Sequence, residues 1–319
     1  MSEFALIRTF FADIGPGRAD VALGVGDDCA LLTIPPGHEL AVSLDTLVVG
    51  IHFFPDCDPA AIGHKALAVG LSDLAAMGAE PAWSTLALTL PTGDADWLRT
   101  FSAGFAALSH RHGIRLVGGD TTRGPLSVTV QVHGLVPVGA AVRRSGARPG
   151  DLIGVSGTLG DAGLALRGLL AGNEVEPALR QRLECPTPRV DLGLRLRGLA
   201  TAMLDLTDGL AGDLGHILTA SGVGAELELA RLPLSAPVAE VIEQTADWSL
   251  PLSAGDDYEL CFCVPPERFD ALRSLAAGLH CPVQAVGRIR AEPGLICRLP
   301  DGGILTINGA GYDHFVVQP

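Results

Sequence analysis

Basic residues are scarce in this chain, and their scarcity excludes two functional classes. Lys65 is the only lysine among 319 residues, and Lys and Arg together number 22 against 36 Asp and Glu, a formal net charge of -14. A Walker-type phosphate loop needs Gly-Lys-Ser/Thr, whereas Lys65 follows His64. Nucleic-acid binding depends on clustered Lys and Arg. We therefore expect neither a Walker-type nucleotide site nor a nucleic-acid partner.

Long apolar runs are also missing, although 48% of the residues are hydrophobic. No stretch approaches the roughly 20 apolar residues that a helix needs to cross a bilayer. Near the N-terminus, Glu3 stands where a signal peptide would be basic. We expect a cytoplasmic protein with no membrane partner, long enough for two ordinary domains.

Cysteines occur without a metal-binding pattern. The seven form no Cys-x-x-Cys pair and their number is odd, while Cys261 and Cys263 fall on the same face of an expected strand. Buried, reduced thiols are the simplest interpretation, and a zinc site is disfavoured.

One carboxylate lies inside an amphipathic helical pattern at residues 59–77. Asp58 is placed as the N-cap of this helix, and Gly78 is placed as its stop. Asp73 falls near the middle of the apolar stripe, which consists of Ile62, Ala66, Val69 and Met77. A buried acid needs a cation or a hydrogen-bonding partner. From the residues alone, a metal site and a structural pair or cap are equally good interpretations.

Other aspartates follow short apolar strands predicted along the chain. The strands are expected at residues 21–25, 40–44, 114–117 and 202–204, and the acids that follow them are Asp28, Asp45, Asp120 and Asp205. A sheet that aligns its strand ends would bring such acids together. A plain turn is the alternative for Asp27-Asp28. Asp208 is predicted to cap the helix that begins near Leu210, which would leave only Asp205 there without a structural role.

Two further segments could contact phosphate. Arg143, Arg144 and Arg148 lie in a Gly/Pro-rich stretch, residues 137–150, that is the best candidate for a domain boundary. They could clamp phosphate or belong to a solvated linker. The strand, glycine loop and helix start at residues 152–164 could form an anion site, but the spacing matches no nucleotide fingerprint.

The aspartates imply a particular chemistry if they converge. Like charges brought close together repel unless divalent cations neutralise them. Oxygen ligands favour Mg²⁺, Mn²⁺ or Ca²⁺ over zinc. The pattern therefore predicts metal-assisted phosphoryl transfer, in which positioning and charge neutralisation carry most of the catalysis.

Seven segments, taken in order, resemble the bacterial thiamine-monophosphate kinase family. They are GVGDDCALL at 24–32, SLDTLV at 43–48, HKALAV at 64–69, LSDLAAMGA at 71–79, GGDTTRG at 118–124, DLTDGL at 205–210 and DYEL at 257–260. The resemblance runs almost end to end, and the joint match is far more specific than any single motif.

This resemblance implies an α/β (α+β) protein with the two-domain fold of the aminoimidazole ribonucleotide synthetase superfamily. It implies residues 1–138 as an N-terminal ATP- and Mg-binding domain that pairs into a homodimer, and residues 139–319 as a C-terminal domain. The implied activity is ATP-dependent phosphorylation of thiamine monophosphate to thiamine diphosphate by direct in-line transfer. The implied cofactor is Mg²⁺, several ions of it, with ATP as co-substrate and a K⁺ requirement left open.

The resemblance also assigns roles to residues. It implies Mg²⁺ ligation by Asp28, Ser43, Asp45, Asp73, Asp120, Asp205 and Asp208, with Asp45, Asp73, Asp120 and Asp208 as the catalytic set. It implies ATP contacts by Gly119, Asp120, Arg144 and Thr207, and contacts to thiamine phosphate by His52, Asp256 and Tyr312. Thr207 stands where the family often has serine, and Asp256 where glutamate is common.

Two alternatives compete with this function. Another ATP-using synthetase of the same superfamily would activate a different acceptor. A non-catalytic regulator that binds divalent metal or nucleotide would use the acids structurally.

Overall fold

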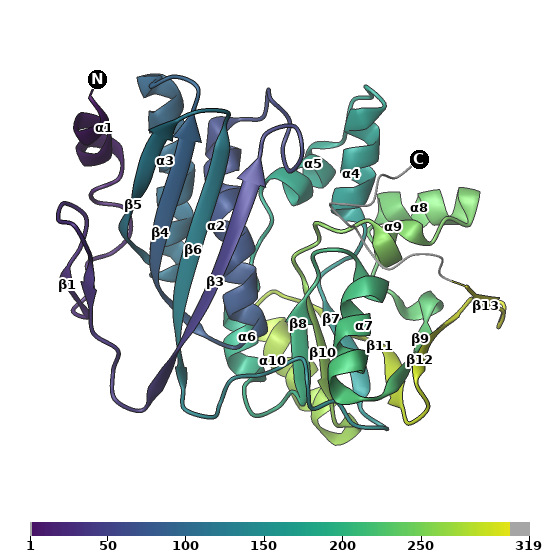
Figure 1. The fold of residues 1–319 in the computed structure, drawn as a ribbon. Coiled ribbons are helices and arrows are strands. Elements are labelled where there is room, and N and C mark those ends of the chain that lie inside the picture. The colour runs from purple at the N-terminus through teal and green to yellow at the C-terminus, as the bar shows by residue number, and fades with distance from the viewer. Residues whose placement is uncertain (1, 307–319) are drawn as a thin grey trace. The chain divides into compact units, whose positions relative to one another are not determined.

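The computed structural model describes residues 2–306, which form a mixed α/β protein with two compact units (Figure 1). Residues 2–74 and 78–141 make the first unit, and residues 75–77 and 142–306 make the second. No helix of the described residues combines the length and apolar character needed to span a membrane.

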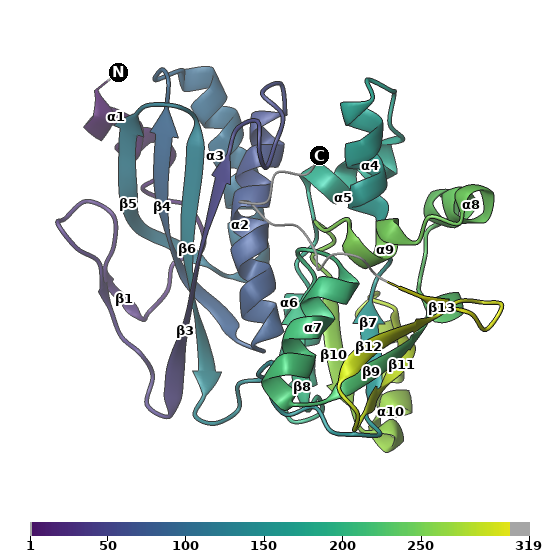
Figure 2. The same cartoon turned by 45° about the vertical axis from the view of Figure 1, so that its right-hand side comes forward.

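The first unit is built on a four-stranded sheet in the order β3-β6-β4-β5. Its strands are β3 (His38–Val48), β4 (Glu80–Leu90), β5 (Arg115–Arg123) and β6 (Ser127–Pro137). The β4–β5 pair is parallel and the other two pairs are antiparallel. Helices α2 (Pro59–Ala76) and α3 (Ala95–His112) cover one face of the sheet (Figure 2). Helix α1 (Glu3–Phe10) and the small hairpin of β1 (Val21–Leu23) and β2 (Leu31–Leu32) complete this unit.

Helix α2 confirms the expected helix at residues 59–77. The Asp58 carboxylate accepts a hydrogen bond from the Ala60 amide at 2.9 Å, and Gly78 follows the helix with a φ of 63°. A Cβ added at Gly70 would lie 2.9 Å from the Val132 side chain on β6. This close approach seats α2 directly on the sheet.

The second unit contains a seven-stranded sheet in the order β13-β12-β9-β11-β7-β10-β8. Its strands are β7 (Leu152–Ser156), β8 (Ala202–Asp205), β9 (Gly224–Glu228), β10 (Leu260–Val264), β11 (Val283–Arg290), β12 (Gly294–Arg298) and β13 (Ile304–Leu305). Its helices are α4 (Asp161–Leu170), α5 (Pro177–Glu184), α6 (Val190–Leu196), α7 (Leu210–Ser221), α8 (Ala236–Thr245), α9 (Ser249–Ser253) and α10 (Pro266–Gly278), with a short 3-10 turn, η1 (Leu229–Arg231).

Strand β10 lies deep in this sheet, between β7 and β8, and all five of its residues are buried. Cys261 and Cys263 belong to it, and both are free thiols in the hydrophobic core. The expectation of buried, reduced cysteines on this strand is therefore confirmed, whereas Cys29 is exposed.

Two expected strand ends are wrong. Strand β3 continues through Asp45 to Val48, and β5 continues through Asp120 to Arg123. Polar side chains interrupt the apolar pattern in both strands, so the sequence predicted ends that come too early. Backbone pairing of β3 with β6 and of β5 with β4 keeps these residues in the extended conformation. Asp45 and Asp120 therefore lie within strands, while Asp205 does end β8 as expected.

Candidate functional site

Two acids and a hydroxyl meet on the helix-covered face of the first unit. Ser43 and Asp45 alternate on β3, so both side chains point to the same side of the strand. The Ser43 hydroxyl donates a hydrogen bond to the Asp73 carboxylate on α2. The structure thus unites three of the residues that the sequence predicts as Mg²⁺ ligands, and it does so through a helix packed on a sheet.

The carboxylates of Asp45 and Asp73 repel each other. Burial, the nearby charge of Asp73 and a hydrogen bond with Asp73 together raise the pKa of Asp45 to about 7. The Oδ2 atom of Asp45 is buried and has no hydrogen-bond partner among the described residues. These oxygen ligands suit a hard divalent cation such as Mg²⁺. The cation would reduce the repulsion between the two carboxylates and would bind the Oδ2 atom of Asp45.

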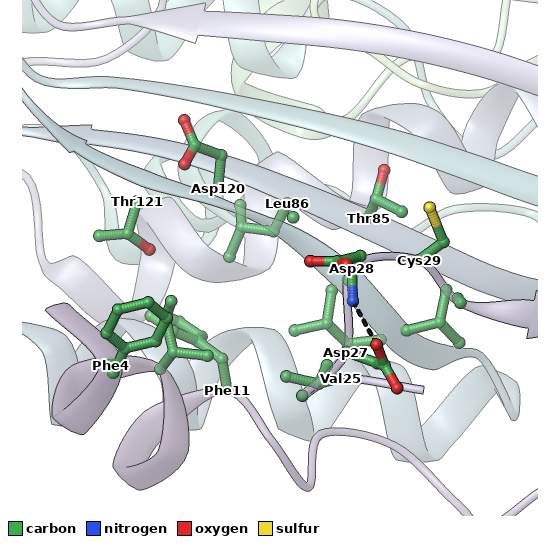
Figure 3. A pocket seen from close by; sticks show the side chains of 17 residues that line it. Phe4, Phe11, Val25, Asp27, Asp28, Cys29, Thr85, Leu86, Asp120 and Thr121 are labelled. Carbon is green, nitrogen blue, oxygen red and sulfur yellow. Dashed lines mark hydrogen bonds between the residues drawn. The ribbon is translucent and has the colours of Figure 1, made fainter. Parts of the chain in front are cut away.

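A second group of acids lines a hollow of about 660 Å³ in the same unit. Asp27, Asp28 and Asp120 contribute to its wall, together with Phe4 and Phe11 near the N-terminus (Figure 3). The Asp27 carboxylate accepts a hydrogen bond from the Asp28 amide at 2.8 Å, as a turn residue does. The hollow therefore combines acidic and aromatic walls, a composition suited to a ligand with a charged and an apolar end.

These two groups face opposite sides of the sheet. Asp45 aligns with Val130 of β6, which is buried on the helix-covered face, whereas Asp120 aligns with the exposed Ala87 of β4. Strands β3 and β5 are also the two edges of the sheet. The expectation that aligned strand tips bring Asp45 and Asp120 together is therefore wrong within this unit.

Gly119 has a structural reason to be glycine. A Cβ at this position would lie 1.9 Å from the Leu86 carbonyl oxygen, and its φ is 150°. The close pairing of β5 with β4 thus excludes other residues here, whether or not a ligand approaches.

A hydrogen bond from the main chain fixes the tautomer of the neutral His52 side chain. Its Nδ1 accepts a hydrogen bond from the Val48 amide at 3.0 Å, so the neutral ring carries its proton on Nε2. Lys65, which is buried, donates to the His52 carbonyl oxygen at 3.4 Å. A histidine fixed in this way can donate a hydrogen bond through Nε2, which suits an anionic ligand.

In the second unit, the predicted acids surround the turn between β8 and α7. Asp205 is buried at the end of β8, and Thr207 and Asp208 are half-buried in the turn. Asp208 does not cap α7 as expected, since Gly209 occupies the N-cap position without a side-chain cap. Asp213, in the first turn of α7, instead binds the preceding turn by accepting the amides of Thr207 at 2.9 Å and Asp208 at 3.0 Å.

Asp213 was missed from the sequence, although an acid in the first turn of a helix is a recognisable signal. Burial raises its pKa to about 6, against the opposing effect of the amides that it accepts. Because Gly209 is the N-cap of α7, neither Asp205 nor Asp208 occupies that position.

The loop before β10 carries Asp256. The Tyr258 hydroxyl donates to the Asp256 carboxylate at 2.9 Å, and both residues have positive φ, 60° for Asp256 and 49° for Tyr258. Non-glycine residues rarely adopt this conformation, and an aromatic residue does so least easily. Tyr312, the other predicted substrate contact in this half of the chain, lies outside the described residues.

A buried ionic cluster anchors that loop to its surroundings. Glu259 is fully buried and accepts two hydrogen bonds of 2.6 Å from Arg189, together with one of 2.6 Å from the Ser156 hydroxyl. Arg182 approaches the same carboxylate at 2.9 Å. These contacts fix the residue that follows the Asp256–Tyr258 loop, and none of them was foreseen from the sequence.

The expected anion site at the glycine loop before α4 is filled by the chain itself. Both carboxylate oxygens of Asp257 accept the Gly160 amide, at 3.0 and 3.1 Å, at the N-terminus of α4. A Cβ at Gly157 would meet the Glu259 carboxylate at 2.1 Å. The loop therefore has an internal carboxyl group where a phosphate would bind, and Arg144 remains an exposed residue of the second unit.

Replacing Asp257 with asparagine should stabilise the protein increasingly, relative to wild type, as pH rises. Burial raises the pKa of Asp257 well above its usual 3.8, against the opposing charge of Arg182. Between these two pKa values the unfolded chain releases a proton that the folded chain keeps, so wild-type stability falls by up to about 1.4 kcal/mol per pH unit. The asparagine of the Asp257→Asn variant has no such proton. Thermal unfolding from pH 4 to pH 8 measures the difference.

Asp20→Asn is the control of opposite sign, because the hydrogen bond from Arg18 lowers the pKa of Asp20. This variant should lose stability relative to wild type above pH 4 and recover as pH falls. Parallel pH profiles for Asp257→Asn and wild type would contradict the assignment of a buried, protonated Asp257.

Within residues 2–306, no three His, Cys, Asp or Glu side chains already lie close enough to hold a metal ion. The donors that fit Mg²⁺ best are Ser43, Asp45 and Asp73, because all are oxygen ligands and Asp45 Oδ2 is a buried oxygen without a hydrogen bond.

Comparisons with known proteins agree along nearly the whole chain. The family described as "AIR synthase related protein, N-terminal domain" matches residues 26–136, and "AIR synthase related protein, C-terminal domain" matches residues 148–299. A thiamine-monophosphate kinase of Escherichia coli (strain K12) is 50% identical over 320 residues, which cover 98% of this chain and 98% of that protein.

Solved structures give the same result. A crystal structure of thiamine-monophosphate kinase from Stenotrophomonas maltophilia K279a has a TM-score of 0.84 and 48% identity, covering 89% of this chain and 92% of that one. The structure described as "AaThiL complexed with AMPPCP and TMP" has a TM-score of 0.78 and 31% identity, covering 89% of each chain.

Proposed function

The chain belongs to the thiamine-monophosphate kinase family of AIR synthase-related proteins, and we propose on this basis that it phosphorylates thiamine monophosphate with ATP. The products are thiamine diphosphate and ADP. The observation that carries this proposal is the 50% identity to a thiamine-monophosphate kinase over 98% of both chains. The match spans the segments that carry the residues proposed below to bind substrate and metal.

The proposed Mg²⁺ ligands are Asp28, Ser43, Asp45, Asp73, Asp120, Asp205 and Asp208, of which Asp45, Asp73, Asp120 and Asp208 act in catalysis. The raised pKa of the half-buried Asp45 beside Asp73, and its buried Oδ2 atom without a hydrogen bond, support this assignment. Bound Mg²⁺ would neutralise the repulsion between the two anionic substrates. The acids of this chain contribute by holding several negative charges at fixed positions, which they tolerate only with cations nearby.

No catalytic base is needed for the proposed reaction. The acceptor is a phosphate monoester with a second pKa of about 6, so it is mostly deprotonated at neutral pH. Its phosphate can attack the γ-phosphorus of ATP directly, while ADP leaves. What the protein must supply is orientation and charge compensation.

The substrates have separate proposed contacts. For ATP these are Gly119, Asp120, Arg144 and Thr207, and the aromatic and acidic hollow beside Asp120 supports nucleotide binding there. For thiamine monophosphate they are His52, Asp256 and Tyr312. The Nε2 proton of His52 suits the phosphate, and the carboxylate of Asp256, oriented by Tyr258, suits the cationic thiazolium ring.

The proposed assembly is a homodimer formed by the N-terminal domain, residues 1–138, with residues 139–319 as the C-terminal domain. Leu40, Val42 and Leu44 are 39%, 50% and 58% exposed on β3, on the side opposite Ser43 and Asp45. Three apolar side chains in a row on an edge strand of the first unit support an interface there. The cytoplasmic location stays a prediction from the sequence.

Val42→Arg is expected to convert this dimer to a monomer, because it places a charge in the middle of the apolar row. Sedimentation equilibrium should give wild type twice the chain mass of 33.0 kDa and the variant that mass once. Leu170→Arg on α4, where the leucine is 70% exposed, is the matched control and should stay dimeric. A monomeric wild type would exclude the interface.

The test of the activity is an assay of the full chain with ATP, Mg²⁺ and thiamine monophosphate, in which thiamine diphosphate and ADP are measured by chromatography. We expect equal amounts of the two products. A synthetase of the same superfamily would release ADP only with another acceptor, and a non-catalytic regulator would release none with any thiamine compound.

A further inference from the structure

The turn between β8 and α7 carries side chains with proposed roles on a backbone that is itself tightly held. Four residues, 206–209, connect the last residue of β8 to the first residue of α7. Thr207 and Asp208 lie in this turn and are half-buried. Gly209 follows with a φ of 103°, and a Cβ there would lie 2.6 Å from the backbone of Ser253. The turn therefore has little room to adjust.

Asp213 binds the main chain of this turn from the helix side. It is 4% exposed, and its Oδ2 accepts the amides of Thr207 and Asp208 at 2.9 and 3.0 Å. One carboxylate thus gathers two successive N–H groups, as a bound phosphate does at a helix N-terminus.

The opposite side of the turn is bound by the loop that carries Asp256. The Asp256 amide donates to the Thr207 carbonyl oxygen at 2.9 Å, and the Tyr258 amide donates to the Leu206 carbonyl oxygen at 2.8 Å. The carbonyl groups of the turn are therefore fixed by main chain, and its N–H groups by the Asp213 side chain. Removal of Asp213 would release one side of the turn and leave the other bound.

This arrangement restricts how the turn can meet a nucleotide. Because the N–H groups of Thr207 and Asp208 already serve Asp213, a phosphate cannot use these two groups without displacing that carboxylate. Phosphate and metal contacts from the turn must then come from side chains, the Thr207 hydroxyl and the Asp208 carboxylate. Their directions are set by the backbone that Asp213 holds.

We propose that Asp213 is a positioning residue for Mg²⁺–ATP, which holds Thr207 and Asp208 in their binding orientation without touching the ligand. The inference rests on the proposed function, because Thr207 and Asp208 have their ATP and metal roles there. It adds a residue outside the proposed ligand set, whose loss weakens binding through the backbone.

The test compares Asp213→Asn and Asp213→Ala with wild type by calorimetric titration of a non-hydrolysable ATP analogue with Mg²⁺, without thiamine monophosphate. Loss of a group that orients metal ligands typically lowers metal affinity about 10- to 100-fold. We expect a loss of that size for Asp213→Ala. The Asp213→Asn side chain keeps one acceptor oxygen, so the loss in that variant should be smaller. In turnover, the Mg²⁺ concentration at half-saturation and the KM for ATP should rise in the same order.

Asp151→Asn is the matched control. Asp151 is also a buried carboxylate of the second unit, and it accepts the Arg148 amide at 3.0 Å and the Thr201 hydroxyl at 2.6 Å. Its replacement should lower the melting temperature and leave analogue binding and the Mg²⁺ requirement unchanged. That contrast separates positioning from general stabilisation.

Three results would overturn the proposal. One is unchanged Mg²⁺–analogue affinity in a folded Asp213→Ala or Asp213→Asn protein. Another is an equal loss of affinity in Asp151→Asn. The third is loss of folding in Asp213→Asn while Asp151→Asn folds, which would make Asp213 a purely structural cap. A wild type that binds the analogue but does not phosphorylate thiamine monophosphate would refute the proposed function instead, and the binding comparison would still decide the role of Asp213.

Discussion

Asp73→Asn is expected to abolish turnover while leaving the protein folded and at least as stable as wild type at pH 8. The substitution keeps the shape of the side chain and an oxygen that can accept the Ser43 hydroxyl. It removes one of the two negative charges in the group of Ser43, Asp45 and Asp73. Loss of charge neutralisation worth several kcal/mol in the transition state corresponds to at least about a 100-fold fall in kcat/KM. Product formation from thiamine monophosphate measures it.

Although the Asp73→Asn variant should lose activity, its stability relative to wild type should increase as pH rises. In wild type, burial and the charge of Asp73 raise the pKa of Asp45 to about 7. The unfolded chain releases that proton near pH 4, so wild-type stability declines as pH rises from 4 to about 7. Without the charge of Asp73, the pKa of Asp45 falls and the decline shrinks. The melting temperature of Asp73→Asn relative to wild type should therefore increase between pH 5 and pH 8.

Asp96→Asn is the control for this result, because Asp96 is an exposed acid on α3 with a side chain that is 88% accessible. The Asp96→Asn substitution also removes one negative charge, and this variant should keep full activity. Near-normal turnover in Asp73→Asn would remove the metal-binding role of this pair. A large fall in stability at pH 8 would show instead that Asp73 serves mainly to hold α2 on β3.

Local sequence patterns predicted much of the fold. Helix α2 was found from its apolar stripe, its Asp58 cap and its Gly78 stop, all of which act within a few residues. The apolar runs of β7 and β10 were found because both strands are nearly or fully buried. Strand β3 was predicted too short, because both of its ends depend on pairing with β6, which local patterns do not encode.

Local patterns predicted the site residues less well. The meeting of Asp73 with Ser43 joins positions 30 residues apart, and the Ser156–Glu259 hydrogen bond joins positions 103 residues apart. Motif likeness predicted a set of metal-binding acids, but tertiary packing decides which of them meet. The β8–α7 turn shows the same limit at short range, since the N-cap rule favours Asp208 but Gly209 is the N-cap and Asp213 binds the amides of the turn.

Glu259→Gln is expected to cause the largest loss of stability, about 3–5 kcal/mol, because it leaves Arg189 without its buried counter-charge and Arg182 with Asp161 alone at 3.6 Å. The Glu259 carboxylate is fully buried and receives both Arg189 hydrogen bonds at 2.6 Å. Although burial opposes the charged form of Arg189, Glu259 raises its pKa, and the guanidinium stays charged after the substitution because arginine is always protonated in proteins. Urea unfolding of the variant and wild type measures the loss.

The double variant Arg189→Met with Glu259→Gln separates a lost interaction from a stranded charge. If the stranded guanidinium causes the damage, its removal should return part of the stability, and the double variant should be more stable than the sum of the two single losses predicts. The partly exposed pair Arg298–Glu226, 2.8 Å apart, is the control, and Glu226→Gln should change unfolding far less because solvent screens its charges. Additive losses at Arg189 and Glu259 would contradict a coupled pair. Glu259 would then act mainly through Ser156, whose hydroxyl also accepts the Leu260 amide at 2.9 Å at the start of β10.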